Sequence, residues 1–437
     1  EIHDGNFCMD GLVYPDRTVH TGLLEYKNVY RPARVISYDK ESGELMLHNY
    51  MDFDDLKDYV KISYELTQDG LVISKGKLPE VSVAPHSEGK TNLKINVPEN
   101  GKCYLKLIYH LKKELPLLDE EHILGFDEIE VSKDDAKCKL AEKWLQKTAV
   151  DSELQVNEND TQIHIKGREF AYTIDKRTAL FTEMKFAGRE YLNHPMELNI
   201  WRAPTDNDMY IKSEWKKAHY DKAYTRAYTT EVVQGKHGVK ITSHASVVAE
   251  TVQKILDVMI TWKIEVAGKI DADIEVTKDD EFPDLPRFGV RMFLDKKLSA
   301  ARYFGMGPQE SYCDKHQASS HGLYQANVDD LHEDYIRPQE NGSHYDCEYV
   351  ELNNSRYGIV VSAENAFSFN ASYYTQEELE KKTHNYELTE SDSLVFCVDY
   401  ALNGIGSNSC GPVVLEQYRF DDVLFRFQFT LIPYVKG

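Results

Sequence analysis

The sequence VMITWKIEVAGKIDADIEV, residues 258–276, decides the fold class, because its apolar side chains recur with a period of two. The residues that face one way are Val258, Ile260, Trp262, Ile264 and Val266, then Ile270, Ala272, Ile274 and Val276. Gly268-Lys269 interrupts the alternation between the two runs. The stretch therefore predicts two long antiparallel strands joined by a tight turn.

The same alternation recurs toward both ends of the chain. Near the C-terminus the alternating apolar residues are Phe425, Phe427, Phe429 and Leu431. Earlier, the runs lie at 62–66, 71–73, 93–97, 104–109 and 126–131, with a turn signal at Asp69-Gly70. About seven short strands in ~100 residues fit an immunoglobulin-like sandwich over residues 33–131.

Length and composition agree with a multi-domain, mostly β protein. A chain of 437 residues is too long for one compact domain. With 41% hydrophobic and 28% charged residues it can bury real cores. Its 28 Tyr and 17 Phe suit pleated surfaces better than helices.

The charge balance and the cysteines restrict partners and compartment. A formal net charge of −22 repels phosphate backbones and anionic lipids, which argues against nucleic acid and membrane partners. The seven cysteines are dispersed without a C-x-x-C pair, as expected in a reducing compartment such as the cytoplasm. The first residue is Glu1 rather than Met, which favours a piece of a longer parent.

The alternation is interrupted by a charged linker and by short helical stretches. Residues 132–151 are charged and Lys-rich, with a helix expected near 136–146. Two more helices are expected at 213–224 and 376–383. Thr375 is placed to cap the second of these, and Glu378 to complete a capping box.

Five segments differ from ordinary strands. They are HDGNFCMDGL (3–12), WRAPTDND (201–208), YFGMGPQESY (303–312), RPQENGSHYDCEY (337–349) and LNGIGSNSCGP (402–412). Asp206 and Asp208 would face one side of a strand, or bind a cation in a loop. An Asx-turn that satisfies backbone donors is the simpler interpretation. The glycines of 303–312 form no phosphate loop, because the downstream Lys-Ser/Thr is missing.

Other polar residues leave several chemistries open. Glu310 and Glu340 are candidates for a glycosidase acid pair, although isolated acids near turns are usually solvated or capping. His316, His321 and His344 are too irregularly spaced to predict a metal site. Cys410 is a possible nucleophile, but an inert buried thiol is the simpler interpretation, since no partner base is evident.

The order of these segments is more specific than any one of them. It resembles the C-terminal half of the long bacterial β-galactosidases of glycoside hydrolase family 2. That family carries RAP-x-DND, LG-x-GPQE-x-Y, P-x-ENG and GIG…SP, which appear here at 202–208, 304–312, 338–342 and 404–412. The similarity runs from about residue 4 to the end of the sequence.

The resemblance implies a domain division. Residues 1–23 would be the tail of a TIM barrel, and 24–132 an immunoglobulin-like β-sandwich. Residues 133–152 would be a linker, and 153–437 a large supersandwich domain of the galactose-mutarotase type, closing over the mouth of the active site. The expected fold class is all-β, a sandwich followed by a supersandwich.

The resemblance also implies a function. In such enzymes two glutamates of the barrel hydrolyse β-galactosides by a retaining mechanism. A barrel of ~250 residues cannot fit before residue 24, so this chain alone is expected to have no catalytic residue and no lactase activity. Two other functions stay open. One is a stand-alone carbohydrate-binding module with exposed aromatics. The other is a mutarotase-like epimerase using His316, His321 and Glu310.

By resemblance, few site residues transfer to this chain. Phe7, through its carbonyl, and Asp10 match sodium ligands, and His3 falls where an outer magnesium ligand occurs. We expect both cations in the full enzyme and neither bound tightly here. Cys410 replaces a Trp that stacks on the aglycone sugar in some members.

The remaining expectations concern the sugar and the assembly. Asn408, Ser409 and Cys410 are expected to line the aglycone side. Asp206 and Asp208 are expected to help position the β-galactoside. The implied partners are the N-terminal and barrel domains of the same parent, and further copies in a homo-oligomer.

Overall fold

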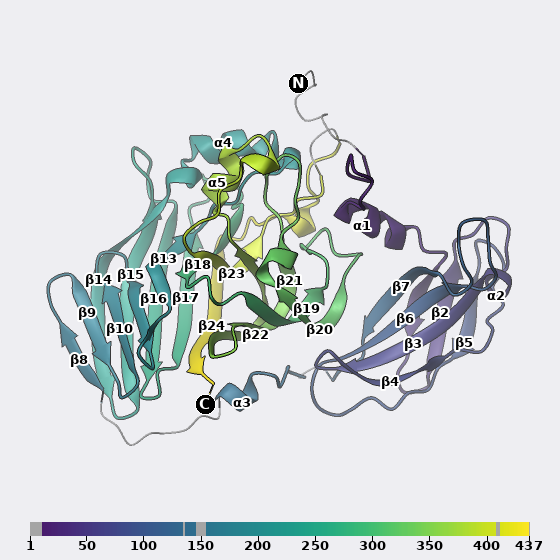
Figure 1. The fold of residues 1–437 in the computed structure, drawn as a ribbon, viewed down its shortest axis with the longest axis horizontal. Coiled ribbons are helices and arrows are strands. Elements are labelled where there is room, and N and C mark those ends of the chain that lie inside the picture. The colour runs from purple at the N-terminus through teal and green to yellow at the C-terminus, as the bar shows by residue number, and fades with distance from the viewer. Residues whose placement is uncertain (1–10, 134–135, 146–153, 408–410, 437) are drawn as a thin grey trace.

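The computed structural model describes residues 11–133, 136–145, 154–407 and 411–436. Within them the chain forms two β units, a smaller one near the N-terminus and a larger one after the linker (Figure 1). The all-β prediction is confirmed. No helix in these residues is long and apolar enough to span a bilayer.

The smaller unit is a sandwich of two antiparallel sheets. One sheet contains β1 (Ala33–Tyr38), β2 (Glu44–Asn49) and β5 (Glu88–Asn92) in that order. The other has the order β4 (Leu71–Lys77), β3 (Val60–Gln68), β6 (Cys103–Leu111), β7 (Ile123–Glu130). Residues 33–131 thus hold seven strands, as expected. The run at 93–97 is not a strand. The strand in this part of the chain is β5, which pairs with β2 at the edge of the sheet and ends at Asn92, just before the run.

The larger unit packs one sheet against another. Its smaller sheet has the order β12 (Arg189–Glu190), β11 (Leu180–Phe186), β10 (Phe170–Asp175), β9 (Gln162–Lys166), β8 (Gln155–Glu158). The main path of the other sheet runs β13 (Leu192–Asn199), β18 (Arg287–Leu294), β23 (Leu394–Leu402), β22 (Tyr357–Ser372), β24 (Leu424–Val435), β17 (Ile270–Lys278), β16 (Leu256–Glu265), β15 (Gly238–Val248), β14 (Tyr224–Gly235). Off that path, β19 (Ala300–Gly307) pairs with β20 (Ser320–Asn327) and β21 (Ser343–Asn353), and β21 pairs with β22.

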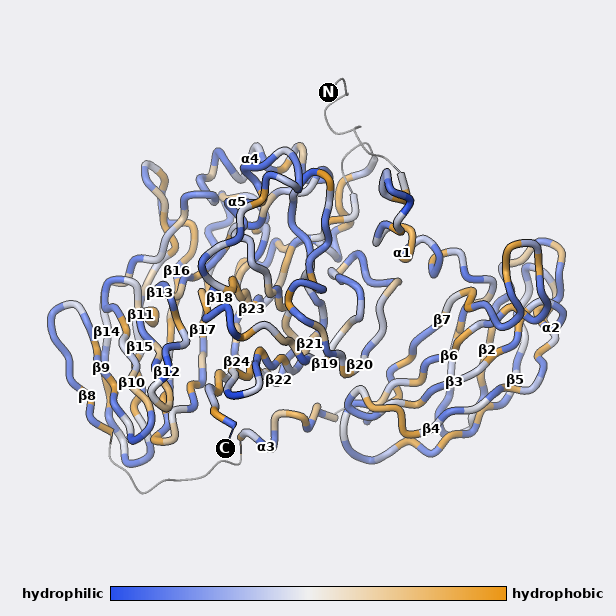
Figure 2. The backbone as a smooth tube through the Cα atoms, in the orientation of Figure 1, coloured by the Kyte–Doolittle hydropathy of each residue, from blue (hydrophilic) through white to orange (hydrophobic). Residues whose placement is uncertain are grey.

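The stretch at 258–276 forms the core of this unit. It makes the β16–β17 hairpin, and the inward residues expected from the alternation are all buried. The alternation is visible along these strands in Figure 2. Trp262, fully buried, donates its Nε1–H to the Ala179 carbonyl at 2.8 Å and packs edge-on against Phe181 of β11. One aromatic side chain therefore joins the two sheets.

Helices are short and connect the sheets. They are α1 (Thr21–Val29), α2 (Leu56–Tyr59), α3 (Glu142–Leu145), α4 (Ile211–Lys217) and α5 (Gln376–Lys381). The 3₁₀ turns are η1 (Asp206–Asp208), η2 (Tyr220–Lys222), η3 (Val328–Leu331), η4 (Asn385–Glu387) and η5 (Glu416–Tyr418). The expected helix at 213–224 is wrong in extent. It divides into α4 and η2, because His219 adopts a left-handed conformation (φ 58°) between them.

The two units meet along β6, β7 and β20. His321 of β20 contacts Glu128 of β7 at 2.7 Å and Asp346 of β21 at 2.9 Å. Its ring stacks on Tyr104 of β6, with centroids 4.0 Å apart. Trp144 of α3 packs against Tyr434, which fixes the end of the linker to the larger unit.

Candidate functional site

The 201–208 segment leaves β13 and turns back on itself through η1. Asp208 accepts hydrogen bonds from Arg202 Nε at 3.1 Å, from Arg202 Nη2 at 2.7 Å and from the Thr205 amide at 2.9 Å. The Arg202 and Asp208 side chains are 0% and 4% exposed. Asp206 instead points outward, toward Arg337 and Gln339. The two aspartates do not face one side, because η1 is a tight turn and not a strand.

The same segment holds the start of the 402–412 loop. Arg202 Nη1 donates to the Asn403 carbonyl, and Nη2 donates to the Gly404 carbonyl at 3.1 Å. The Asn207 side-chain amide donates to the Ile405 carbonyl at 2.6 Å. Arg202 and Asn207 thereby fix the three carbonyls at the start of the loop that leads toward Asn408.

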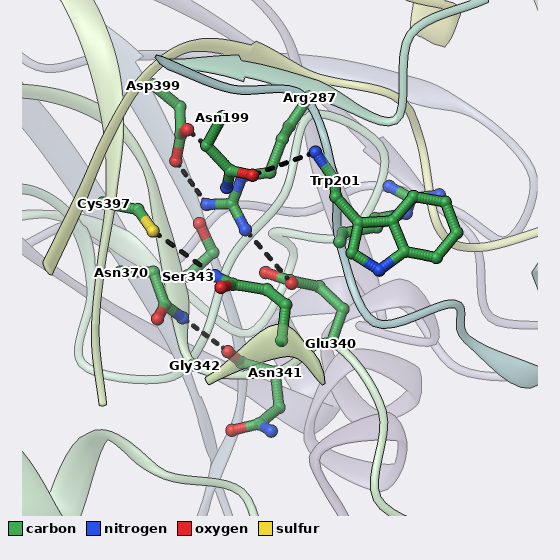
Figure 3. Close-up of polar contacts among 12 residues, drawn as sticks. Asn199, Trp201, Arg287, Glu340, Asn341, Gly342, Ser343, Asn370, Cys397 and Asp399 are labelled. Carbon is green, nitrogen blue, oxygen red and sulfur yellow. Dashed lines mark hydrogen bonds and ion pairs between the residues drawn. The ribbon is translucent and has the colours of Figure 1, made fainter. Parts of the chain in front are cut away.

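A second group of buried charges is centred on Arg287 (Figure 3). Arg287 of β18 donates to Asp399 of β23 through Nε at 3.1 Å and Nη2 at 2.5 Å, and to Glu340 through Nη1 at 3.2 Å. All three side chains are buried. The Glu340 amide donates to the Ala203 carbonyl at 3.0 Å, which joins this group to the Arg202–Asp208 pair. We call Arg202, Asp208, Arg287, Glu340 and Asp399 the buried polar layer.

The charges of the buried polar layer do not balance. Three carboxylates face two guanidinium groups, and arginine stays protonated. Burial raises the pKa of Glu340 against the opposing effects of Arg287 and Arg202. Its Oε1 atom has no hydrogen-bond partner in the described part of the chain. Burial raises the pKa of Asp399 as well, but Glu340 alone of the three carboxyls has an oxygen without a partner among the described residues, so its ionised form is the least stabilised.

Glu310 occupies a separate, fully satisfied pocket. Its Oε1 accepts from Lys315 Nζ and from the Tyr335 hydroxyl, both at 2.5 Å, and its Oε2 accepts from the Gly342 amide at 2.8 Å. Burial would raise the pKa of Glu310, but Lys315 and these hydrogen bonds outweigh it and lower that pKa. Glu310 and Glu340 therefore have different partners and pKa shifts of opposite direction, and they do not form an open acid pair.

Next to the buried polar layer lies a groove of about 860 Å³, which we call the polar groove. Its lining includes Asn207, Asp208, Tyr210, Asp284, Ser407 and Arg419. Of its acids, Asp208 is paired with Arg202, and Glu214 with Lys217 at 2.8 Å. Burial, assisted by Asp421, raises the pKa of Asp284, the remaining acid.

The histidines have structural partners. His321 lies in the interface between the two units, and His316 Nδ1 contacts the Tyr312 carbonyl at 3.0 Å. His344 is buried, and burial lowers its pKa to about 4. With Glu310 held by Lys315, these residues do not assemble the His pair and free Glu base that an epimerase needs.

Several expected site residues lie outside the described residues. They are His3, Phe7, Asp10, Asn408, Ser409 and Cys410. Elsewhere in the structure, no group of three or more His, Cys, Asp or Glu side chains is arranged to hold a metal ion. The expected sodium site and the aglycone wall therefore stay predictions.

The sequence analysis did not single out Arg287 or Asp399. A signal for both was present, since each is a charged residue inside an otherwise apolar strand: RFGVRMFL (287–294) and LVFCVDYAL (394–402). A buried charge needs a partner of opposite sign. Neither sequence shows that β18 and β23 are neighbours.

Fold and site together define a two-unit β protein in which motifs far apart in sequence build one wall of a groove. Residues 166–431 match the family described as beta galactosidase small chain, and 45–132 match beta-galactosidase, domain 4. The chain belongs to the β-galactosidase small chain family. These ranges lie within two of the predicted domains, 24–132 and 153–437. The boundaries of those domains stay predictions.

Similar curated proteins agree with this assignment. A β-galactosidase of Actinobacillus pleuropneumoniae is 44% identical over 98% of this chain, and one of Staphylococcus xylosus is 31% identical over 99%. The chain spans only 42% and 43% of their lengths. These matches confirm the resemblance to the C-terminal portion of a long β-galactosidase. Galactose 1-epimerase from Lactobacillus acidophilus NCFM, a solved structure, is 8% identical, with a TM-score of 0.36 over 66% of this chain and all of that one.

Proposed function

We propose that this chain supplies the C-terminal domains of a β-galactosidase that hydrolyses terminal β-D-galactosides, with both catalytic glutamates outside it. The supporting observation is that the 202–208 segment is hydrogen-bonded to both the 338–342 and the 403–405 segments, and that Asn207, Asp208 and Asn403 line the polar groove. Buried ion pairs hold these segments in place, so the loop carrying Asn408, Ser409 and Cys410 starts from a rigid base. The chain then forms a wall of the sugar site.

The acids of the polar groove support the placement of catalysis elsewhere. A retaining glycosidase needs two carboxylates ~5–5.5 Å apart, one of them a free nucleophile. Within the part of the chain that the structure describes, Asp284 is the one acid of this groove without a Lys or Arg ion-pair partner. In this proposal Asp208 positions the loop through Arg202, and Asp206 positions the 337–339 segment; neither aspartate reacts. Phe7 and Asp10 contribute to a sodium site in the full enzyme.

A chimera tests the proposal. The matching segment of the Actinobacillus pleuropneumoniae β-galactosidase is replaced by this chain, and hydrolysis of nitrophenyl β-galactoside is measured. We expect turnover by the chimera and none above a contaminant control by this chain alone. A soluble, folded but inactive chimera contradicts the proposal, and so does turnover by the isolated chain.

A further inference from the structure

A second cavity, of about 310 Å³, lies where β22, β23 and η5 come together. Four of its lining side chains, Tyr312, Phe367, Leu402 and Phe420, are buried, each at most 8% exposed. Cys313 also lines it, with Sγ 3.7 Å from the Leu402 carbonyl and 3.9 Å from the Tyr418 carbonyl. We call this cavity the tyrosine cup. Arg419 lines both the cup and the polar groove.

Three tyrosines form the wall of the cup: Tyr345, Tyr400 and Tyr418. None of their hydroxyls has a hydrogen-bond partner among the residues that the structure describes, although all three are partly buried. Tyr hydroxyls usually find a partner when buried. Some buried tyrosines of this chain do so, as in Tyr109 to Asp127, Tyr172 to Gly268 and Tyr191 to Tyr434, whereas Tyr104 and Tyr303 have no such partner among the described residues. The free hydroxyls at the cup are therefore available to a ligand.

The charges around the cup nearly cancel. Asp346 on its rim is bound to His321, whose pKa is raised to about 9 against the effect of burial by Asp346 and Glu128. Asp422 and Arg419 carry opposite charges, and neither has an ion-pair partner in the described ranges. A cup with balanced charges favours neither anions nor cations, so the ligand that fits it is uncharged and rich in hydroxyls.

We propose that the tyrosine cup binds the ring of an uncharged saccharide, separately from the polar groove. A pyranose has an apolar C–H face that packs on aromatic rings, and hydroxyls at its edge that match Tyr, Asp and Arg side chains. The volume lies at the lower end of the ~300–1,000 Å³ typical of small-molecule sites, as suits one ring. With one ring bound, the dissociation constant is expected on the order of 1 mM. The inference concerns binding alone and does not depend on the proposed hydrolysis.

Saturation-transfer NMR of the whole chain with lactose, and separately with galactose, tests the inference. Tyr418→Ala removes one wall of the cup, and Tyr400→Phe removes one hydroxyl without changing the core packing of that ring. We expect Tyr418→Ala to weaken binding about tenfold and Tyr400→Phe to weaken it by less. Thermal unfolding of both variants establishes that they are folded.

A tyrosine outside both sites is the matched control. Tyr386→Ala changes an exposed side chain of η4, 79% accessible, and should bind lactose as the unmodified chain does. Tyr210→Ala changes the polar groove and reports whether sugar bound there contributes to the signal. Loss of binding in Tyr210→Ala with retention in Tyr418→Ala overturns the inference, because the sugar then lies in the polar groove. Absence of a signal from either sugar with the unmodified chain overturns it as well.

Discussion

Glu310 and Glu340 are both buried, but the free energy needed to ionise each of them inside the protein differs. Glu310 is surrounded by donors, so its ionised form is stabilised inside the protein. Glu340 shares Arg287 with Asp399 and has one oxygen without a partner among the described residues. Their surroundings therefore shift the pKa of the same side-chain type downward at one site and upward at the other.

This difference predicts unequal responses to the same substitution. Glu310→Gln leaves the mostly buried Lys315 ammonium unpaired, so we expect it to lower the free energy of unfolding by about 3 kcal/mol at pH 7. Glu340→Gln removes a carboxyl whose ionised form burial already disfavours, and should cost less than about 1 kcal/mol. Urea unfolding measures both. Glu364→Gln, in an exposed pair with Lys137, is the control and should change stability very little.

The pH dependence of stability separates the same residues. Because the folded pKa of Glu340 is raised above its usual 4.5, the native state binds the proton more tightly than the unfolded chain. Stability should fall as pH rises from 4.5 toward that folded pKa. Glu340→Gln should remove this part of the pH profile in urea unfolding measured between pH 4 and pH 8. An identical profile in the variant would contradict a raised pKa of Glu340 in the folded protein.

At the scale of elements, helix α5 shows which local signals are reliable. Thr375 Oγ1 accepts from the Glu378 amide at 3.1 Å, as the sequence predicted. The second half of the capping box is wrong, because the Glu378 carboxylate accepts from the Thr389 amide at 2.9 Å instead. The Thr375 cap involves residues close in sequence, so the sequence predicts it. The Thr389 amide that binds the Glu378 carboxylate belongs to a later loop, which the local sequence does not show.

The cap can be tested directly. Thr375→Ala removes the acceptor for the first turn of α5 and should lower the free energy of unfolding by about 1 kcal/mol. Thr229→Ala, on an exposed position of β14, makes the same chemical change without a cap and should cost only a few tenths of that. Equal effects in urea unfolding would mean that the cap contributes nothing.

At the scale of the whole molecule, His321 joins the two units electrostatically. Burial alone would lower its pKa, but the hydrogen bonds to Asp346 and Glu128 raise it to about 9. The folded pKa exceeds the usual 6.5, so the imidazolium stabilises the native state fully below pH 6.5. This contribution disappears as pH rises toward 9. The difference of pKa corresponds to about 3 kcal/mol.

His321→Gln should therefore destabilise the protein at pH 6 by about 3 kcal/mol and have a much smaller effect at pH 9.5. Urea unfolding at the two pH values measures this difference. His244→Gln, in a half-exposed pair with Asp257, is the matched control and should show little dependence on pH. A loss in His321→Gln that is equal at both pH values would assign its effect to packing on Tyr104 alone.

The sequence by itself determined the strands of this protein, because alternation with a period of two is local and one shifted residue would expose the core face. It also determined the order of the motifs that identify the family. It could not show that Arg202 reaches the 403–405 turn or that Arg287 reaches Asp399, 112 residues away. Only the tertiary structure decided these contacts. A buried charge pairs with an oppositely charged or polar group within hydrogen-bond distance, and the order of strands in the sheet determines which group that is.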